Sequence, residues 1–392
     1  MNSVLILFHC DSNVGYAIAP LERTFYEMAL SLCDGDASRV HFAYKRMDRG
    51  PSSSMPAEFH NYVVMDSAST DRRHHAEVRQ YIRETGIDVL FGFDQGVSGP
   101  LYRSFRRAGV RHFVSYWGAP MSSENGLLKR SLKRLEVALR RNGPDHYVFE
   151  SHGMARLATH GRGIPPGRIS VVHLGVDTRK FRPDPADVAY VYEQFGIPRD
   201  RRVFFYSGHF EPRKGVAVIM EAANWLPRED WHIVLCGNKG AESLPYEAML
   251  SGKARRHVTF AGYRNDLDRL QRGCYAAVIA SSGWDSFPRS GMEMQATGLP
   301  LLASDLIGLR EAIEDGVSGF LFRTGDGGAL AKVMEVLLND PSLRDQLSRQ
   351  ARERIERSFS LQTQLSQLIA IMRHQVSVSL PIAESRAPVH HE

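Results

Sequence analysis

The sequence predicts an α/β protein made of two doubly wound domains that face each other across a cleft. Short apolar strands alternate with longer helical patterns along the chain, and the series is interrupted once, at the seam Phe181–Pro185. A length of 392 residues is enough for two domains that each bury a core. Strand, helix and strand repeated at this spacing indicate parallel sheets with helices on both faces.

Twelve short apolar runs are predicted to be strands, seven before the seam and five after it. The first seven are Val4–Phe8, Val40–Tyr44, Tyr62–Met65, Val89–Phe93, His112–Tyr116, His146–Glu150 and Ser170–His173. The other five are Val203–Ser207, His232–Cys236, His257–Phe260, Ala276–Ser281 and Leu301–Ser304.

The seam and the terminal pattern divide the chain into four parts. We expect one domain over residues 1–184 and a second over residues 185–360. The amphipathic segment Leu361–Arg373 predicts a helix, so residues 361–375 are expected to pack back on the first domain. The polar residues 376–392 are expected to be disordered.

Composition narrows the class of protein. A hydrophobic content of 43% and a charged content of 24% are typical of soluble globular proteins. No apolar run approaches the ~18 residues that would span a bilayer. Met1–Ser3 carries no positive side chain, and Val4–Phe8 is too short for the core of a signal peptide. We therefore expect a cytosolic protein.

Cysteine and histidine spacing gives no sign of a metal site. The four cysteines form no Cys-x-x-Cys pair, which favours structural thiols in a reducing compartment. None of the sixteen histidines has metal-ligand spacing in a segment that is expected to be ordered. We expect neither a metal nor a redox centre.

Charge is unevenly distributed along the chain. Residues 1–184 carry 25 Lys and Arg against 19 Asp and Glu, whereas the remainder carries 24 against 25. A basic first half indicates an anionic partner there, either a membrane surface or a phosphate-bearing acceptor. Nucleic acid is disfavoured because no binding motif accompanies the charge.

One candidate binding loop follows the strand Val203–Ser207. The loop Gly208–Gly215 contains the adjacent cations Arg213 and Lys214, and a helix is predicted to begin near Val216. A helix amino terminus and free backbone N–H groups attract anions, so this pattern suits a diphosphate. Lys214 adds a point charge, and Arg213 can bind bidentately if it points inward. The alternative is a solvated loop with ordinary surface cations.

A second candidate loop sets two acidic residues eight positions apart. Asp285 lies in the turn after the strand Ala276–Ser281, and Glu293 lies one turn inside the next helix. Both would face a ligand held beyond the carboxyl ends of parallel strands. The alternatives are that Asp285 only enters the helix and that Glu293 only interacts with the helix dipole.

Two common nucleotide-binding motifs are absent from the sequence. No Gly-x-Gly-x-x-Gly follows any predicted strand, and there is no Walker sequence. A nicotinamide-dependent or ATP-hydrolysing enzyme is therefore disfavoured.

A series of motifs runs in order through residues 145–360. They are Val171–Asp177 with Phe181–Pro183, Lys214-Gly215, Leu235–Gly237, Val258–Gly262, Asp285 to Glu293, Gly298–Pro300 and Glu311–Leu321. In order and spacing they resemble the GT-B glycosyltransferases, in particular the retaining enzymes of glycosyltransferase family 4. The first domain matches only loosely, chiefly through Gly15. The resemblance implies two Rossmann-like domains, an acceptor-side domain first and a nucleotide-sugar-binding domain second.

The resemblance assigns roles to three charged positions. It implies that Lys214, helped by Arg213, binds the donor diphosphate and stabilises negative charge on the leaving nucleotide. Glu293 would accept hydrogen bonds from the ribose hydroxyls. Asp285 would face the transferred sugar near its reacting carbon, and we expect Asp285, Lys214 and Asp94 to be the catalytic residues.

The remaining donor contacts that the resemblance implies come from Gly15, Gly208, His209, Tyr263, Arg264, Ser286, Phe287 and Arg289. Backbone amides of the last three would contact the sugar or phosphates, and Tyr263 or Arg264 would stack on the base. Gly15 would let first-domain backbone approach the phosphates. The alternatives are rim packing for Tyr263 and a simple turn for Gly15. Glu311 is expected to support a helix start.

The chain departs from the family pattern at three places. Asp285 stands where the family usually has Glu, and His209 stands where it usually has Arg. The histidine often found in the first domain has no counterpart, because Tyr116 or Trp117 takes its place. Asp94, after a predicted strand, is the candidate polar group that faces the acceptor.

The segment Gly126–Arg141 combines leucines and cations. On a helix, one stripe would hold Leu128, Leu132, Leu135 and Leu139, and the opposite face would hold Arg130, Lys133, Arg134 and Arg141. This pattern suits a helix that rests on anionic lipid headgroups. We favour the interpretation in which the leucines face the domain core. The basic face over Lys129–Arg141 then remains available for contact with an anionic membrane.

With the resemblance, the sequence predicts an α-retaining hexosyltransferase that moves a sugar from a nucleotide-diphosphate donor to a sugar or lipid-linked acceptor. The family's habits imply surface polysaccharide, lipopolysaccharide or glycolipid assembly, in the cytoplasm or peripheral to the inner membrane face. No metal is expected, because cations replace it and no Asp-x-Asp segment follows a strand. The alternatives are a sugar-nucleotide epimerase of the same fold and a weakly active partner subunit, given His209 and Trp117.

Overall fold

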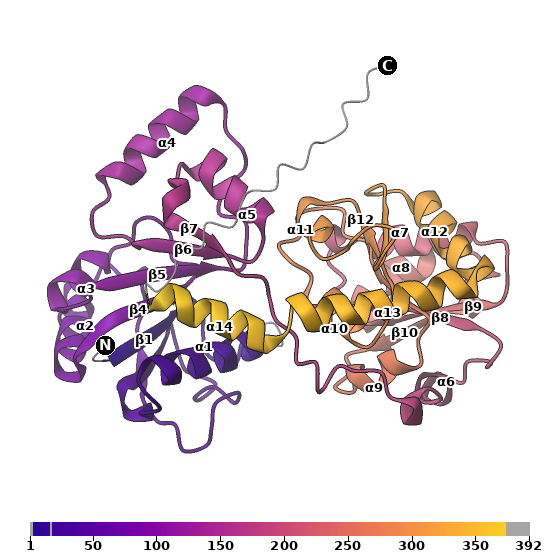
Figure 1. The fold of residues 1–392 in the computed structure, drawn as a ribbon, viewed down its shortest axis with the longest axis horizontal. Coiled ribbons are helices and arrows are strands. Elements are labelled where there is room, and N and C mark those ends of the chain that lie inside the picture. Colours follow the sequence, from indigo (N-terminus) through magenta and orange to yellow (C-terminus); the bar gives the residue numbers. More distant parts are fainter. Residues whose placement is uncertain (1–2, 16–17, 374–392) are drawn as a thin grey trace.

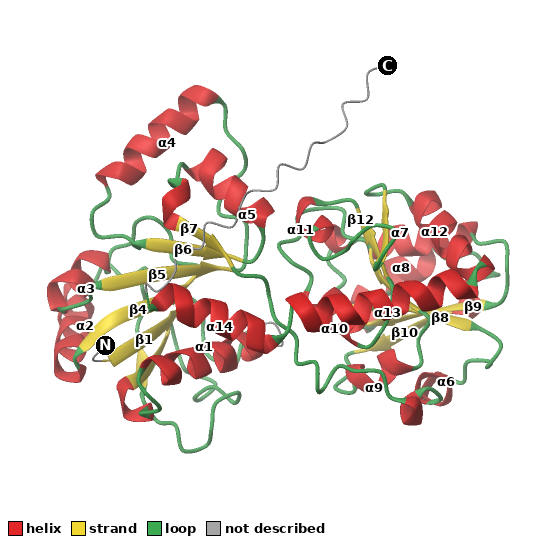
Figure 2. Ribbon diagram, viewed as in Figure 1, coloured by secondary structure: helices red, strands yellow, loops and turns green. Residues whose placement is uncertain are grey.

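A computed structural model describes residues 3–15 and 18–373 of the chain. It has two lobes, each with a parallel sheet between helices (Figures 1 and 2). This arrangement confirms the predicted α/β class with two doubly wound domains. The expected tail over residues 376–392 lies outside the described residues.

The first sheet has seven parallel strands in the order β3-β2-β1-β4-β5-β6-β7. The strands are β1 (Ser3–Phe8), β2 (Val40–Tyr44), β3 (Tyr62–Val64), β4 (Ile87–Phe93), β5 (His112–Trp117), β6 (His146–Phe149) and β7 (Ile169–Val171). The strand order reverses between β1 and β4, which is where doubly wound sheets bind ligands.

The second sheet repeats this plan in the order β10-β9-β8-β11-β12-β13, and its reversal lies between β8 and β11. Its strands are β8 (Arg202–Ser207), β9 (Trp231–Cys236), β10 (Val258–Gly262), β11 (Ala276–Ile279), β12 (Leu301–Ser304) and β13 (Gly319–Phe322). The sequence predicts all of these strands except β13. That edge strand has four residues, two of them half-buried, so its apolar signal is short.

Helices cover both faces of the two sheets (Figure 2). Those of the first lobe are α1 (Ala19–Leu32), α2 (Arg72–Thr85), α3 (Tyr102–Ala108), α4 (Leu127–Leu139) and α5 (His152–Leu157). Those of the second lobe are α6 (Tyr190–Phe195), α7 (Val216–Trp225), α8 (Leu244–Ala248), α9 (Leu267–Arg272), α10 (Arg289–Ala296), α11 (Ile307–Arg310), α12 (Gly327–Asn339) and α13 (Pro341–Ser358). Because helices cover both sides, central strands such as β1 are buried along their whole length and read as continuous apolar runs.

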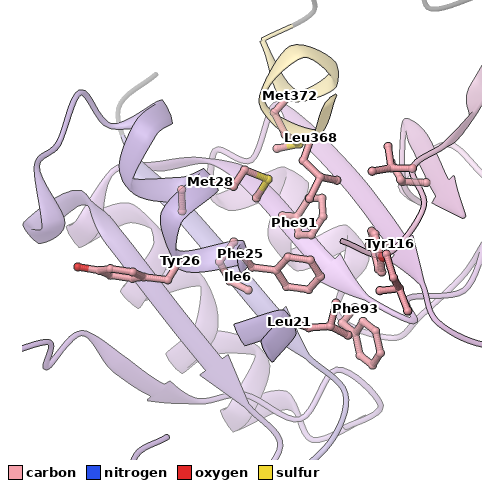
Figure 3. Packing of buried hydrophobic residues seen from close by; sticks show 14 of the residues in the cluster. Ile6, Leu21, Phe25, Tyr26, Met28, Phe91, Phe93, Tyr116, Leu368 and Met372 are labelled. Carbon is pink, nitrogen blue, oxygen red and sulfur yellow. The ribbon is translucent and has the colours of Figure 1, made fainter. Parts of the chain in front are cut away.

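The last helix, α14 (Leu361–Met372), crosses back and packs on α1 of the first lobe. Leu368 and Met372 join the buried cluster that contains Phe91 and Tyr116 (Figure 3). At the crossing, the amide of Val176 donates to the carbonyl of Phe359 at 2.9 Å. The two lobes are therefore joined by a second stretch of chain as well as by the linker.

The structure contradicts the predicted orientation of α4. Leu128, Leu132, Leu135 and Leu139 are 78%, 60%, 58% and 71% exposed, so they do not face the domain core. The domain instead holds the opposite face, because Glu136 pairs with Arg162 at 2.9 Å and Val137 is the buried residue of the helix. An amphipathic pattern identifies two faces but not which of them meets the protein.

Candidate functional site

The predicted site residues of the second domain lie at the point where its strand order reverses. The cationic loop, Gly208–Gly215, follows β8, and the acidic loop, Ser281–Pro288, follows β11. Since β8 and β11 are neighbours in the sheet, their carboxyl ends bring the two loops together.

Lys214 and Asp285 form the centre of this arrangement. The Lys214 ammonium donates to Oδ2 of Asp285 at 2.8 Å, and the Ser281 hydroxyl donates to the same oxygen at 2.9 Å. The Asp285 side chain is 6% exposed and that of Lys214 is 25% exposed. The cation is therefore held by a buried carboxylate while part of it remains open to a ligand.

Backbone contacts fix the two loops against each other. The amide of Ser282 donates to the carbonyl of Arg213 at 2.8 Å. Gly215 has φ of +69°, and a Cβ there would lie 1.7 Å from the carbonyl oxygen of Ala280. Only glycine tolerates both the left-handed backbone and this close approach. The glycine after Lys214 therefore sets the position of the cation relative to Asp285.

Arg213 does not share the environment of Lys214. Its Nε is 2.8 Å from Oε2 of Glu211, and its guanidinium lies 4.3 Å from the ring centre of Trp284. These contacts hold the side chain between Glu211 and Trp284. A ligand would have to compete with Glu211 for this guanidinium.

The acidic loop leads into α10, whose first residue is Arg289. Glu293 lies one turn further on and is 4% exposed. Phe287 is buried, with its ring 4.9 Å from that of His173 and 5.6 Å from that of Phe359. Its side chain thus anchors the loop to the junction between the lobes, and the role predicted for it concerns only its amide.

A second group of predicted residues lies at the neighbouring strands. The Tyr263 hydroxyl and Nδ1 of His209 are 3.0 Å apart, and Tyr263 is 69% exposed. Gly208 lies at the start of the same loop, where its amide donates to the carbonyl of Cys236. Arg264 turns away and donates to Asp266 at 2.8 Å. Of the two residues proposed to stack on a base, Tyr263 is thus the accessible one.

The first domain contributes Gly15 and Asp94 at the reversal of its own sheet. Gly15 lies in the loop after β1, and Asp94 follows β4 with the unusual φ of +52°. Asp94 accepts a hydrogen bond from the amide of Gly118 at 2.9 Å. Burial raises the pKa of Asp94 to about 6, against the opposing effects of this hydrogen bond and of His9.

Sequence reasoning missed Glu150, which directly follows β6 and is 3% exposed. Its carboxyl accepts hydrogen bonds from the hydroxyls of Tyr116 and Ser286, both at 3.3 Å. Burial raises its pKa to about 8, although the charge of Arg289 acts in the other direction. The signal was present: an acidic residue ended the predicted strand His146–Glu150 at the ligand-binding edge of the sheet.

Glu311 supports a helix start, as expected, but the helix belongs to the other lobe. Its carboxylate accepts from the amides of His152 and Gly153 at the start of α5, both at 2.8 Å, and from Nε2 of His173 at 3.0 Å. Burial raises its pKa, but these three hydrogen bonds together bring it below the ordinary value. His152, His173 and Glu311 could offer nitrogen and oxygen atoms to a cation. Both oxygens of the Glu311 carboxylate already accept hydrogen bonds, however, so we assign Glu311 a structural role.

The structure therefore brings Lys214, Asp285, Ser286, Arg289 and Glu293 together on adjoining segments. Tyr263 and His209 form a neighbouring pair, and Gly15 and Asp94 lie on the other lobe. A surface hollow of about 660 Å³ beside α7 and α12 contains none of these residues. The first of these groups, around Lys214, suits an anion at the ammonium and hydroxyl groups at the buried carboxylates of Asp285 and Glu293.

Two Rossmann-like domains with ligand loops at both sheet reversals define the GT-B class of glycosyltransferase. Residues 18–175 match the family model described as glycosyl transferase 4-like domain, and residues 191–354 match glycosyl transferases group 1. The chain belongs to the group 1 glycosyltransferases of the GT-B fold.

Curated relatives match part of the chain. D-inositol 3-phosphate glycosyltransferase of Mycolicibacterium gilvum is 35% identical over 207 residues, which are 50% of this chain and 46% of the relative. The putative glycosyltransferase EpsD of Bacillus subtilis is 30% identical over 202 residues, 50% of this chain and 52% of the relative. The chain thus spans about half the length of these relatives.

Solved structures match nearly the whole fold. A glycosyltransferase from Rickettsia africae has a TM-score of 0.81 at 17% identity, covering 97% of this chain and 100% of the other. Anabaena Alr3699/HepE in complex with UDP has a TM-score of 0.78 at 19% identity, covering 95% and 100%. WaaG, a glycosyltransferase involved in lipopolysaccharide biosynthesis, has a TM-score of 0.68 at 17% identity, covering 94% and 99%. At these identities the similarity shows the fold.

Proposed function

We propose that this protein is an α-retaining glycosyltransferase that uses a nucleotide-diphosphate hexose. The observation that carries the proposal is the Lys214–Asp285 pair. It places a partly exposed cation against a buried carboxylate at the point where the strand order of the second sheet reverses. Neighbours of the same fold bind UDP or UDP-glucose, which supports a nucleotide-sugar donor. The two domains would divide the substrates, with the donor on residues 185–360 and the acceptor on residues 1–184.

In this proposal Lys214 neutralises charge on the departing diphosphate. The bond between the anomeric carbon and the diphosphate oxygen breaks, and the acceptor oxygen bonds to that carbon from the same side. The acceptor proton passes to the released diphosphate, so charge and atoms balance. Lys214 favours this step because the negative charge that it meets grows as the bond breaks. Asp285, beside the transferred sugar, would favour positive charge at the anomeric carbon.

The other predicted residues would hold the donor. Glu293 would accept from the ribose hydroxyls, Tyr263 would stack on the base, and the amides of Ser286, Phe287 and Arg289 would contact sugar or phosphate. Gly15, Gly208 and His209 would line the phosphates. Asp94 would face the acceptor hydroxyl. None of these roles requires a metal ion or another cofactor.

The test begins with a thermal-shift screen over UDP-, GDP-, ADP- and CMP-sugars, followed by product analysis with the best donor. We expect Lys214→Ala to weaken donor binding and slow transfer together, by about 100-fold in kcat/KM. We expect Glu293→Gln mainly to weaken nucleotide binding. Wild-type nucleotide affinity in both variants would contradict the assignment.

The same screen separates the two alternatives. An epimerised sugar formed from donor alone would indicate a sugar-nucleotide epimerase. Thermal stabilisation by nucleotide without turnover on any acceptor would indicate a weakly active partner subunit. The favoured outcome is a new α-linked product that retains the anomeric configuration of the donor.

We further propose that the acceptor is lipid-linked or membrane-borne, in surface polysaccharide, lipopolysaccharide or glycolipid assembly. The exposed leucines of α4 support this proposal, because apolar area of this kind is stabilised on leaving water. Exposed Lys129, Arg134 and Arg141 flank them and suit anionic headgroups. In this proposal the protein attaches from the cytoplasm, peripheral to the inner membrane face. Within the described residues no helix has the length and apolar character to span a bilayer.

A further inference from the structure

A buried polar chain connects the first domain to the acidic loop of the second, and Glu150 is its centre. One Glu150 oxygen accepts from the Tyr116 hydroxyl and the other from the Ser286 hydroxyl. Gln364 of α14 donates to the same Tyr116 hydroxyl at 3.4 Å and accepts from the amide of Gly175 at 3.0 Å. Gln364, Tyr116, Glu150 and Ser286 are all at most 7% exposed.

Burying this series of hydrogen-bonded side chains costs free energy, and only their mutual hydrogen bonds offset that cost. A carboxyl group removed from water destabilises the fold unless hydrogen bonds satisfy it. Tyr116 from β5, Asp94 after β4 and Arg289 of α10 are the titratable groups that act on Glu150. Near neutral pH the raised pKa leaves Glu150 mostly protonated, so its carboxyl can both donate and accept hydrogen bonds with the two hydroxyls.

The acidic loop is restrained from a second side. Gly308 of α11 lies so close that a Cβ there would be 2.0 Å from the carbonyl oxygen of Asp285 and 2.5 Å from that of Ser286. Asp285 is therefore held between α11, Lys214 and, through its neighbour Ser286, the first domain. A shift of Ser286 would move Asp285 and the amides that follow it.

We propose that Glu150 is a positioning residue that fixes the acidic loop from the opposite domain and thereby sets where Asp285 meets the donor sugar. This inference rests on the proposed function, because it assigns a role toward the same donor. Glu150 itself need not touch the donor. It acts through Ser286, which is the acidic-loop residue that it contacts across the junction.

The test uses the full-length protein and the sugar donor selected by the screen. Glu150→Gln keeps a group that donates and accepts, so we expect kcat/KM for the donor to remain within about threefold of wild type. Glu150→Ala and Ser286→Ala remove the contact, and we expect each to lower kcat/KM about 10- to 100-fold, as a displaced reactive group does. The double Ala variant should be no worse than the poorer single variant, because both act through one contact.

Glu22 supplies a matched control. It is also a buried carboxylate of the first domain, and it accepts from the hydroxyls of Tyr44, Ser52 and Ser54 within that domain. Glu22→Ala should lower thermal stability at least as much as Glu150→Ala while leaving donor kcat/KM of the folded protein near wild type.

Three results would overturn the inference. One is Ser286→Ala with wild-type kinetics, which remains measurable even if Glu150→Ala does not fold. The second is a double variant whose losses in kcat/KM multiply. The third is a Glu150→Ala enzyme that loses thermal stability but keeps its donor kinetics, as a purely structural residue would. A wild-type protein that binds no nucleotide would refute the proposed function as well, whereas these three results leave it standing.

Discussion

At the scale of single residues, the position of Lys214 depends on a neighbour without a side chain. Gly215 adopts φ of +69° and lies against the carbonyl of Ala280. Any other residue would meet both an unfavourable backbone conformation and a steric clash. The distance from Lys214 to Asp285 is thus set by backbone packing between the cationic and acidic loops.

We predict that Gly215→Ala lowers the free energy of unfolding by about 1–3 kcal/mol and weakens nucleotide binding by displacing Lys214. Urea unfolding and nucleotide titration measure the two effects. Gly167→Ala is the control, because nothing lies within 4 Å of a Cβ there and its φ is ordinary. Equal behaviour of the two variants would contradict the prediction.

Glu150 also gives the fold a pH dependence. Its pKa in the folded protein is about 8, against an ordinary value of 4.5. Between these values the folded state holds more protons than the unfolded state, so wild-type stability falls as pH rises, by at most ~1.4 kcal/mol per pH unit.

Glutamine does not titrate, so the stability of Glu150→Gln relative to wild type should increase from pH 5 to pH 8 and then level off. Urea unfolding at several pH values measures the difference. A difference that does not change with pH would show that Glu150 is ionised in the folded protein throughout this range.

At the scale of elements, α4 shows how a helix can present either face to its domain. Arg162 and Lys133 hold Glu136 at 2.9 and 3.0 Å, and these hydrogen bonds lower the pKa of Glu136 to about 2. Lys133 belongs to α4 itself, so the bond from Glu136 to Arg162, outside the helix, is the one that directs the polar side inward and the leucines outward. The proposed membrane contact follows from this orientation.

We predict that Leu128→Ser, Leu132→Ser and Leu135→Ser together reduce sedimentation with phosphatidylglycerol vesicles at least tenfold, since each removes exposed apolar area. Charge reversal at Lys129, Arg134 and Arg141 should weaken binding to these vesicles but not to neutral ones.

Leu244→Ser is the control, because Leu244 is 60% exposed on the second domain. Analytical ultracentrifugation without lipid tests the competing explanation. A leucine-dependent dimer that does not bind vesicles would replace the membrane by a second copy of the chain.

At the scale of the whole molecule, Glu311 and α14 join the two lobes. Glu311 binds the start of α5 and His173. The crossing at Phe359 and the packing of α14 on α1 add a second connection. These contacts lie beside Phe287, so the arrangement of the lobes and the position of the acidic loop are coupled.

We predict that Glu311→Gln lowers the free energy of unfolding by about 1–2 kcal/mol at pH 7, as loss of a capping carboxylate does. Because the carboxyl has a lowered pKa, its contribution is present above the ordinary value and is lost as pH falls below it. The wild type and variant should therefore converge in acid.

Small-angle scattering should show a larger radius of gyration for Glu311→Gln if the lobes separate more readily. Glu314→Gln is the control, since Glu314 is more than half exposed and lies 3.7 Å from Arg354. A Glu311 variant as stable as this control would show that the contact does not hold the lobes together.

Local sequence patterns were enough to predict the α/β class, twelve strands, the terminal helix and the two loops that hold Lys214 and Asp285. Local apolar periodicity and loop residues carry this information, because strands buried on both faces must be apolar and ligand loops follow them. The outward leucines of α4, the Glu150–Ser286 contact and the role of Glu311 could be read only from the folded arrangement. Each of these depends on residues far apart in the chain, 136 positions in the case of Glu150 and Ser286, and such pairings leave no local pattern.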